Sequence, residues 1–290
     1  MSKIQRTLGV IGGSGLYELE HLTSVERLEV STSFGAPSAA IMAGAIGSTK
    51  LLFLPRHGAA HELAPHKVNY RANILALKLA GAEQILSVSA VGSMKEDIHP
   101  GDMVIVDQFI DRTRHRIDTF FDDDGVVAHV GLADPIDPQL ANALCAAAER
   151  AGATVHQGAT YLCIEGPQFS THAESALYRS WGVSVIGMTN LPEARLAREA
   201  ELPYVTLAMV TDYDCWHEMH EAVSVEAVVA VMHRNVAKAK EIILELASSV
   251  PDPAGQPATS ALAGAIITET DSISEAAREK LWPLIRKYVP

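Results

Sequence analysis

The stretch YVTLAMV, Tyr204 to Val210, is almost wholly apolar and partly β-branched. A short run of this kind is typical of a buried strand in a parallel sheet, where both faces are covered. In open α/β sheets, ligands lie beyond the carboxyl ends of the strands. The stretch TDYDCW, Thr211 to Trp216, follows directly. The sequence therefore predicts that Asp212 and Asp214 stand at a ligand-binding edge.

Asp212 and Asp214 are two residues apart, so on an extended chain their carboxylates point to the same side. Two adjacent acids repel each other or share a proton, which raises the pKa of at least one of them. Such a pair can donate to one ring nitrogen of a heterocycle and accept from an amino group on the same ring. For these two residues taken alone, a second interpretation stays open, in which Asp212 caps the next helix and Asp214 is solvated.

The composition narrows the class of protein. Of the 290 residues, 48% are hydrophobic and 20% are charged, which favours a soluble, globular chain with a sizeable core. The formal net charge of −12 argues against nucleic acid or an anionic membrane as the main partner. No run has the length of a transmembrane helix, and the first residues lack a signal-peptide core. Cys145, Cys163 and Cys215 show no CxxC pattern, so we expect a reducing, cytoplasmic environment.

Strand-like and helix-like segments alternate along the chain, which predicts an α/β fold. The expected strands cover residues 7–11, 51–54, 84–89, 102–106, 161–164, 183–186 and 204–210. The expected helices cover residues 68–79, 138–151, 171–182, 192–201, 224–248 and 274–288. A long segment of weak periodicity lies between Phe109 and Pro138, and a loop of this length usually serves a site or an interface.

Small or polar residues follow several of the expected strands. After the first strand, glycines at 12, 13 and 15 let backbone amides approach a phosphate, and Ser14 adds a hydroxyl, although a plain tight turn explains this stretch as well. Arg56 and His57 follow the second, and arginine suits bidentate recognition of an oxyanion. A structural role, in which Arg56 pairs with a surface acid, stays open. Ser89, Ala90 and Thr189 follow later strands.

Together these residues form a candidate phosphate cradle, and the two acids form a candidate base pocket. The combination predicts cleavage of a glycosidic bond with inorganic phosphate as the nucleophile. Two rival classes are a non-enzymatic nucleoside-binding module and a metal-dependent hydrolase. The histidines available to a metal are His57, His61, His66, His217 and His220. Gly58 and Pro65 disfavour a helix that would align the first three, and the last two are one residue too close for a metalloprotease helix, so we expect no metal site.

Six motifs link the chain to a known family. They are GGSGL from Gly12, PRHG from Pro55, VNYRANI from Val68, EGPQFS from Glu165, GMTNLPEA from Gly187 and TDYDCW from Thr211. With these motifs the chain resembles the 5′-methylthioadenosine phosphorylases of the trimeric purine nucleoside phosphorylase superfamily, over residues 7–245. The resemblance implies a single α/β domain at residues 1–250, with a central mixed sheet flanked by helices. A linker and a C-terminal helix, residues 251–290, would pack on the same domain.

The resemblance also implies the roles of individual residues. Asp212 would face N7 of the purine and Asp214 its 6-amino group, whereas relatives that act on 6-oxopurines carry Asn in place of Asp212. The phosphate site would be Ser14, Arg56, His57, Ser89, Ala90 and Thr189. The base and ribose would meet Phe169, Ser170 and Met188, and the 5′-methylthio group would meet His129, Val225 and Val228. His129 would come from a neighbouring subunit.

The implied reaction is the phosphorolysis of 5′-methylthioadenosine to adenine and 5-methylthioribose 1-phosphate. Asp212, kept protonated by Asp214 and a dry pocket, would donate to the leaving purine. Inorganic phosphate is a co-substrate, and no metal or organic cofactor is expected. The implied assembly is a homotrimer, or a hexamer of paired trimers, in which a neighbour completes the site. The alternative within the family is a phosphorylase for 5′-methylthioinosine or other purine nucleosides.

Overall fold

The computed structural model describes residues 5–13, 16, 19, 21–122, 125–217 and 225–289, except for the side chains of residues 225–229. Its strands are β1 (Arg6–Gly12), β2 (Thr23–Leu28), β3 (Ile41–Ile46), β4 (Thr49–Pro55), β5 (Gln84–Ser93), β6 (Met103–Arg112), β7 (Val155–Ile164), β8 (Val185–Gly187) and β9 (Tyr204–Asp212). Its α-helices are α1 (Tyr70–Leu79), α2 (Pro138–Arg150), α3 (His172–Ser180), α4 (Asn190–Glu199), α5 (Val225–Ala247) and α6 (Glu275–Ile285). Short 3₁₀ helices cover Pro65–Lys67, Pro257–Ser260 and Thr270–Ser272.

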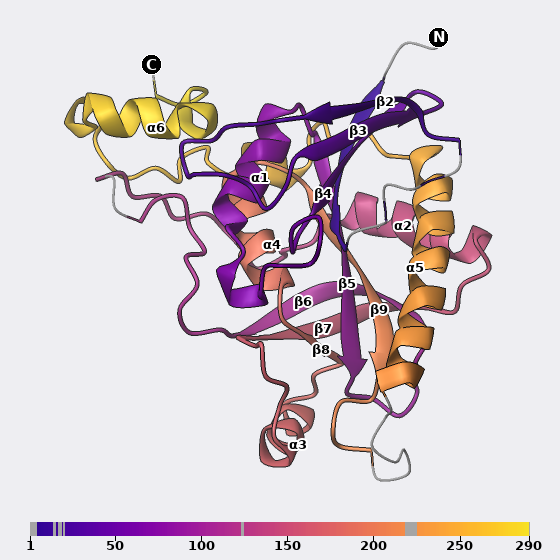
Figure 1. The fold of residues 1–290 in the computed structure, drawn as a ribbon. Helices are drawn as coiled ribbons and strands as arrows, with labels where there is room; N and C mark the ends of the chain where they lie inside the picture. The colour runs from indigo at the N-terminus through magenta and orange to yellow at the C-terminus, as the bar shows by residue number, and fades with distance from the viewer. Residues whose placement is uncertain are drawn as a thin grey trace.

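The strands of the described residues form one mixed sheet in the order β2-β3-β4-β1-β5-β8-β7-β6-β9. Strand β9 also pairs with β5, so β5, β8, β7, β6 and β9 close into a ring. Strands β4, β1, β5 and β9 run parallel to one another. Their carboxyl ends therefore lie at the same edge, where the arrows of β5 and β9 point in Figure 1. The predicted mixed sheet flanked by helices is confirmed.

Apolar side chains hold the ring together. A cluster of buried residues comes largely from its strands, including Val91 of β5, Val104 of β6, Tyr161 of β7 and Val210 of β9. A larger cluster joins β1, β4, β5 and β9 to the helices that cover them. Burying each large apolar side chain contributes about 1.5–3 kcal/mol, so the strand ends are carried on a rigid scaffold.

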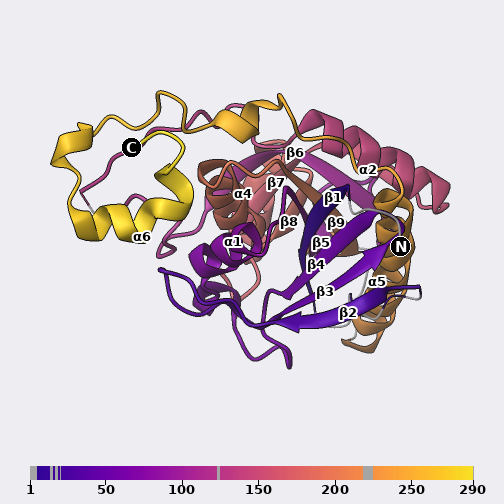
Figure 2. The ribbon, with the colours of Figure 1, turned by 90° about the horizontal axis from the view of Figure 1, so that it is seen from above.

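Helices cover both sides of the sheet. Helix α5 packs along β9 and contacts α2, whereas α1 and α4 pack together on the other side (Figures 1 and 2). Helix α3 lies beyond the edge to which β5 and β9 point (Figure 1). Within the described ranges, we find no helix that combines the length and the hydrophobicity needed to cross a membrane.

The C-terminal segment extends to one side in Figure 2 and still packs on the rest of the chain. Leu281, Leu284 and Ile285 of α6 are buried in the larger cluster. The Ser33 hydroxyl donates to the carbonyl of Lys280 at 2.7 Å, which fixes α6 against the loop between β2 and β3.

Helix starts follow the expected capping chemistry. The Asp137 side chain accepts from the backbone N–H of Leu140 at 2.8 Å and Pro138 opens α2, while Thr171 and Glu174 form a reciprocal capping box at α3. These satisfied donors explain why the two helices begin where the sequence indicated.

Some strands were not predicted. Strand β2 is exposed along nearly its whole length and carries polar residues, so it lacks the apolar run that marks a buried strand. Strand β7 begins at Val155, six residues before the expected start. The sequence analysis missed these residues because the first half of the strand is polar and partly exposed. Strand β6 continues to Arg112, so the long loop expected from Phe109 is shorter than predicted.

Candidate functional site

The two acids stand at the end of β9, but the chain turns between them. Asp212 is the last residue of β9, and Asp214 has a φ of 53°, in the left-handed region. The backbone N–H of Asp214 donates to Oδ1 of Asp212 at 2.8 Å, and the Thr211 hydroxyl donates to Oδ2 at 2.7 Å. The prediction that both carboxylates project from an extended chain is therefore wrong, because a side-chain-capped turn replaces the last step of the strand.

Gly92 of β5 makes room for this turn. It pairs with Asp212 in the sheet, at a point where the register shifts. A Cβ atom at Gly92 would lie 2.9 Å from Oδ1 of Asp212 and 3.2 Å from the backbone nitrogen of Asp214. Any side chain there would push the carboxyl turn away from β5, so Gly92 is a structural requirement of the acid pair.

Asp214 is held by helix α3. The hydroxyl of buried Ser175 donates to Oδ2 of Asp214 at 2.5 Å. Burial raises the pKa of Asp214, and the nearby Asp212 charge raises it further, against hydrogen bonds from Ser175 and Cys215 that lower it. The sequence interpretation put the held proton on Asp212. In the structure, burial favours a proton on Asp214, because loss of solvent disfavours its charged form.

Arg56 follows β4 and is almost fully buried. Its Nε and Nη2 both donate to the carboxylate of Glu193 on α4, with 3.1 Å between Nη2 and Oε2. Nη2 also donates to the Ser87 hydroxyl at 2.7 Å, and Nη1 donates to the carbonyl of Val88 at 3.0 Å. Although burial opposes the charge, Glu193 raises the pKa of Arg56. The bidentate partner of Arg56 is thus a buried acid, which leaves one Nη1 hydrogen without an acceptor among the described residues.

Glu193 sits in a wider buried network. Its Oε2 accepts from Ser87 at 2.7 Å and from the Tyr204 hydroxyl at 3.1 Å. The side-chain amide of Asn190 donates to Ser87 and Tyr204, both at 2.8 Å, and to Thr206 at 3.0 Å. The network joins β5, β9 and α4 beneath the candidate cradle, so the Arg56 guanidinium has little freedom to move.

His57 faces the same region with a defined tautomer. Its Nδ1 lies 2.8 Å from the carbonyl oxygen of Leu63, which can only accept, so Nδ1 carries the proton. Burial and the adjacent Arg56 charge lower the pKa of His57 to about 4. At neutral pH the ring is therefore uncharged, and Nε2 has a lone pair that can accept a hydrogen bond from a protonated phosphate oxygen.

The structure brings Ser89 and Thr189 together, as the candidate cradle requires. Their hydroxyl oxygens lie 3.3 Å apart, and both residues are buried. Thr189 precedes α4 but its side chain makes no capping bond, so its hydroxyl is turned toward Ser89 at the positive end of the helix. Ala90 is exposed beside them. Ser14 lies outside the described residues.

The predicted base and ribose residues have different surroundings. Met188 packs against Gly166, where a Cβ atom would lie 2.5 Å from its sulfur. The hydroxyl of Ser170 is buried and has no partner among the described residues, while its carbonyl accepts from the Cys215 thiol at 3.5 Å. Phe169 is 83% exposed, so in the single chain its ring does not lie in a closed pocket.

Of the predicted methylthio residues, the structure describes the side chain of His129. His129 is exposed, and its backbone N–H donates to the carbonyl of Ala265 at 2.9 Å, next to the C-terminal segment. Val225 and Val228 belong to α5, but their side chains lie outside the described part of the chain.

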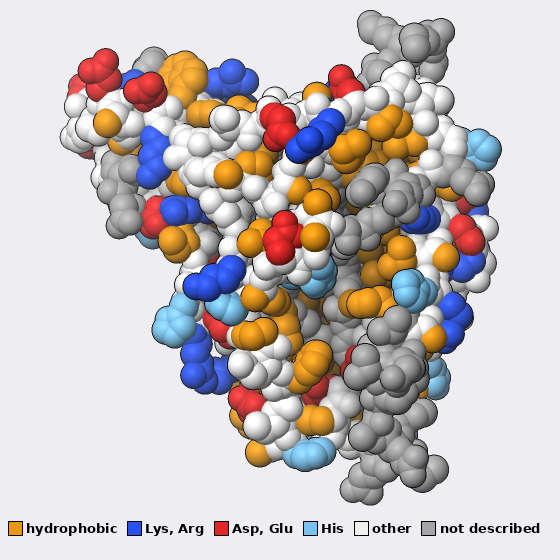
Figure 3. Space-filling model, in the orientation of Figure 1, with side chains coloured by type: hydrophobic (Ala, Val, Ile, Leu, Met, Phe, Trp, Pro, Cys, Tyr) orange, Lys and Arg blue, Asp and Glu red, His pale blue; other side chains and the backbone are white. Residues whose placement is uncertain are grey.

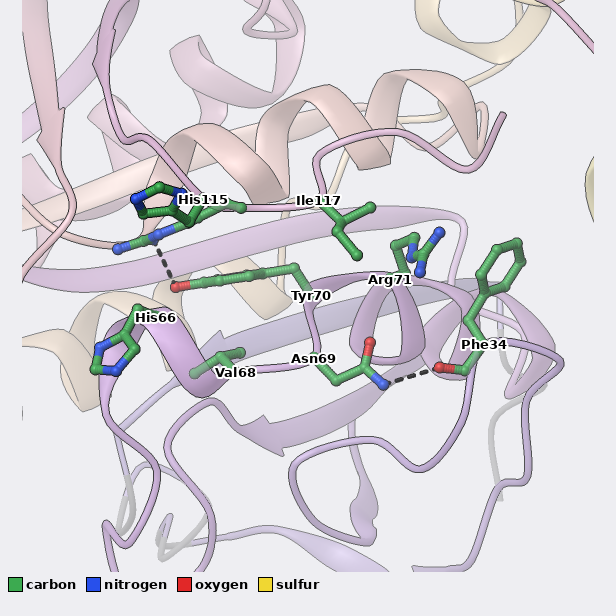
Figure 4. A pocket seen from close by; sticks show the side chains of 9 residues that line it. Phe34, His66, Val68, Asn69, Tyr70, Arg71, His115 and Ile117 are labelled. Atoms are coloured by element: carbon green, nitrogen blue, oxygen red, sulfur yellow. Dashed lines mark hydrogen bonds between the residues drawn. The ribbon is translucent and has the colours of Figure 1, made fainter. Parts of the chain in front are cut away.

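Hollows on the surface lie near these elements. Hydrophobic side chains gather around a hollow near the middle of the face in Figure 3, in front of β4 and β5. A separate cavity of about 260 Å³ is shown in Figure 4. Its wall is formed by Phe34, His66, Val68, Asn69, Tyr70, Arg71, His115, Arg116 and Ile117. A groove of about 850 Å³ lies between α2, the start of β7 and residues 257–258. Neither of the last two contains Asp212 or Asp214.

Several residues around the candidate site escaped the sequence analysis. Glu193 lies within the GMTNLPEA motif, directly after a proline, and its place in that motif is a signal that could have identified it. Ser175 gave none, because a serine on a helix is ordinary until the fold places it against Asp214. Arg116 lies in the long segment after Phe109 and reaches the same region through its side chain. Among the described residues, no cluster of three metal-ligating side chains is found.

Comparison with known proteins adds to this geometry. A family model described as the phosphorylase superfamily matches residues 7–248. An S-methyl-5′-thioadenosine phosphorylase of Geobacter sulfurreducens is 54% identical over 287 residues, which cover 99% of this chain and 100% of that protein.

Solved structures give the same likeness. A crystal structure of a methylthioadenosine phosphorylase from an Antarctic soil metagenomic library has a TM-score of 0.91 and 45% identity, over 97% of this chain and 99% of that one. The methylthioadenosine phosphorylase of Schistosoma mansoni, solved in complex with adenine, has a TM-score of 0.82 and 33% identity, over 91% and 99% of the two chains.

Proposed function

Because this chain belongs to the phosphorylase superfamily, we propose that it catalyses the phosphorolysis of 5′-methylthioadenosine to adenine and 5-methylthioribose 1-phosphate. The observation that carries the proposal is the carboxyl pair of Asp212 and Asp214, set against β5 at Gly92. Three residues earlier on β5, Ser89 meets Thr189 in the candidate phosphate cradle. Strand β5 thus contributes to both parts of the site: Gly92 pairs with the acid turn, and Ser89 belongs to the candidate phosphate cradle.

The acid pair can assist departure of the purine. Breaking the bond between C1′ and N9 develops positive charge on the ribose and negative charge on the base. The nearby Asp212 charge raises the pKa of Asp214, so the protonation of one carboxyl depends on the charge of the other. In the proposal, the pair holds one proton, which Asp212 delivers to N7 while Asp214 accepts from the 6-amino group. Removing such a general acid costs about 10²–10⁴-fold in rate.

Phosphate is the nucleophile, and its oxygens attack C1′ as the base leaves. The remaining Nη1 hydrogen of Arg56, the hydroxyls of Ser89 and Thr189, and the positive end of α4 stabilise its charge. His57 would accept from a protonated phosphate oxygen. Met188 would pack on the ribose, with Phe169 and Ser170 near the base. The chemistry needs proton transfer and positioning, so we propose that it uses no metal and no organic cofactor.

We also propose that the chain works as a homotrimer, or as a hexamer of paired trimers, in the cytoplasm. The exposure of Phe169, and that of His129 beside the C-terminal segment, support a site that a neighbouring subunit completes. The three cysteines form no disulfide, which supports a reducing compartment.

The test is release of adenine from 5′-methylthioadenosine with and without inorganic phosphate, beside adenosine and 5′-methylthioinosine. The proposal predicts release only with phosphate, fastest for 5′-methylthioadenosine, and 5-methylthioribose 1-phosphate as the second product. Equal release without phosphate would identify a hydrolase. Preference for 5′-methylthioinosine would contradict the assignment of the acid pair to adenine.

A further inference from the structure

Arg116 makes an unusually complete set of contacts for a residue in a connecting segment. Its side chain is 2% exposed. Nη1 donates to the Tyr70 hydroxyl at 2.9 Å and to the carbonyl of Met188. Nη2 donates to the carbonyls of Ile164 at 3.3 Å and of Glu165, and Nε donates to Oε1 of Glu165 at 3.3 Å. All five guanidinium hydrogens are therefore used.

These contacts join three segments that the proposed reaction needs in register. Met188 follows β8 and would pack on the ribose. Glu165 begins the loop after β7 that carries Phe169 and Ser170 toward the base. The Tyr70 hydroxyl donates to the carbonyl of Pro65 at 2.8 Å, at the end of the loop that holds His57. In Figure 4, Tyr70 lies between His66 and His115, and a dashed line marks its bond to the Arg116 guanidinium.

The segment that bears Arg116 is itself anchored from outside. Arg195 of α4 pairs with Asp111, at 2.7 Å, and with Asp118. Glu199 accepts from the backbone N–H of Phe120 and from the Thr119 hydroxyl, both at 2.7 Å. Helix α4 thus fixes both flanks of Arg116, while the guanidinium points inward.

We propose that Arg116 is a positioning residue. It fixes the segment at Met188, which packs on the ribose in the proposed function, relative to the loop that begins at Glu165 and approaches the base. The proposal rests on the proposed function, and it concerns the nucleoside half of the site. The phosphate half has its own support, the network of Arg56 with Glu193 and Ser87. Loss of the Arg116 fork therefore affects nucleoside binding and turnover far more than phosphate binding.

The test compares Arg116→Lys with Arg195→Lys. Lysine keeps the charge but has three donors on one atom, so it cannot join all three segments. We expect Arg116→Lys to raise KM for 5′-methylthioadenosine and lower kcat, together by about 10- to 100-fold in kcat/KM, while KM for phosphate changes less than about twofold. Arg195→Lys keeps a cation beside Asp111 and Asp118. It also leaves the Glu199 anchor and the Met188 contact in place, so we expect its kinetic constants to stay within about twofold of those of the unaltered chain.

A second variant, Tyr70→Phe, removes one acceptor of the fork and leaves Arg116 in place, so it covers the case in which Arg116→Lys does not fold. We expect the same selective rise in KM for the nucleoside, by about threefold. Equal effects of Arg116→Lys and Arg195→Lys, parallel rises in both KM values, or an unchanged nucleoside KM in Tyr70→Phe would overturn the role of Arg116. Absence of phosphate-dependent adenine release from the unaltered chain would instead overturn the proposed function.

Discussion

The backbone N–H of Asp214 donates to Oδ1 of Asp212 at 2.8 Å, so the carboxylate of Asp212 itself stabilises the turn that ends β9. The two acids consequently differ in environment. Asp212 accepts from two donors beside it, whereas Asp214 accepts from Ser175 of α3 and is the carboxyl whose pKa burial raises. One sequence motif thus yields two chemically distinct acids.

The raised pKa of Asp214 predicts a stabilising substitution. A carboxyl with a raised folded-state pKa contributes stability that is present below its unfolded pKa and is lost as pH rises through the folded one. Asp214→Asn removes the half-buried charge, so we expect a Tm higher than that of the unaltered chain at pH 8 and an equal Tm near pH 3. Thermal unfolding at both pH values checks this. A lower Tm at pH 8 would show that the Asp214 charge stabilises the fold.

Glu199 gives a wider pH effect. Burial raises the pKa of Glu199 to about 7, and hydrogen bonds from Phe120 and Thr119 offset part of that rise. Between about 4.5 and about 7, the folded chain holds a proton that the unfolded chain has lost. The free energy of unfolding should therefore fall with rising pH, by up to about 1.4 kcal/mol per unit. Urea unfolding across this range measures the slope, and Glu199→Gln should lack that part of it.

The buried pair of Arg56 and Glu193 predicts a large loss of stability on Glu193→Gln. The amide keeps the shape but leaves the guanidinium charge uncompensated in a site where the Glu193 side chain is 0% exposed. Removing one partner of a buried pair costs about 3 kcal/mol or more. Urea denaturation measures the loss, and KM for phosphate should rise because Arg56 loses its orientation.

A control for Glu193→Gln is available in Asp252→Asn. Asp252 pairs with Arg6, and the two side chains are 60% and 27% exposed. An exposed pair contributes about 1 kcal/mol or less. Similar losses in the two variants would mean that burial of the Arg56 pair has no special weight.

Gly92→Ala tests the close approach of the acid turn to β5. The new Cβ atom would meet Oδ1 of Asp212 and the backbone of Asp214, so we expect kcat to fall by about tenfold or more as the turn is displaced. Steady-state kinetics measure this. Gly131→Ala is the matched control, because among the described residues no heavy atom other than those of its two chain neighbours lies within 4 Å of the added Cβ. Equal activity of both variants would place the acid pair outside the reaction.

How far the sequence predicts the structure depends on what each residue contacts. Strands β4, β5 and β9 could be found because they are buried apolar runs. Strand β2 could not, because it pairs only with β3 and lies mostly in solvent. The closure of β9 onto β5 is a long-range pairing that no local pattern encodes.

The same distinction holds at the candidate site. The sequence identified Ser89 and Thr189 as strand-end hydroxyls, and the fold places them 3.3 Å apart. The sequence could not show that Arg56 forms its bidentate hydrogen bonds with Glu193, since the two residues are separated by 137 positions. The sequence also could not show the turn at Asp214. That turn depends on the hydrogen bond from the backbone N–H of Asp214 to the side chain of Asp212, and without it the extended geometry of the strand is the expected continuation.

The measurement that bears most directly on the acid pair compares two leaving groups in Asp212→Asn. One substrate is 5′-methylthioadenosine, whose purine needs a proton to leave. The other is the p-nitrophenyl glycoside of 5-methylthioribose, whose phenolate leaves without one. We expect the variant to lose about 10²–10⁴-fold in phosphate-dependent kcat with the first substrate and less than about tenfold with the second. Equal losses with both substrates, or full activity with the first, would contradict protonation of the leaving purine by this pair.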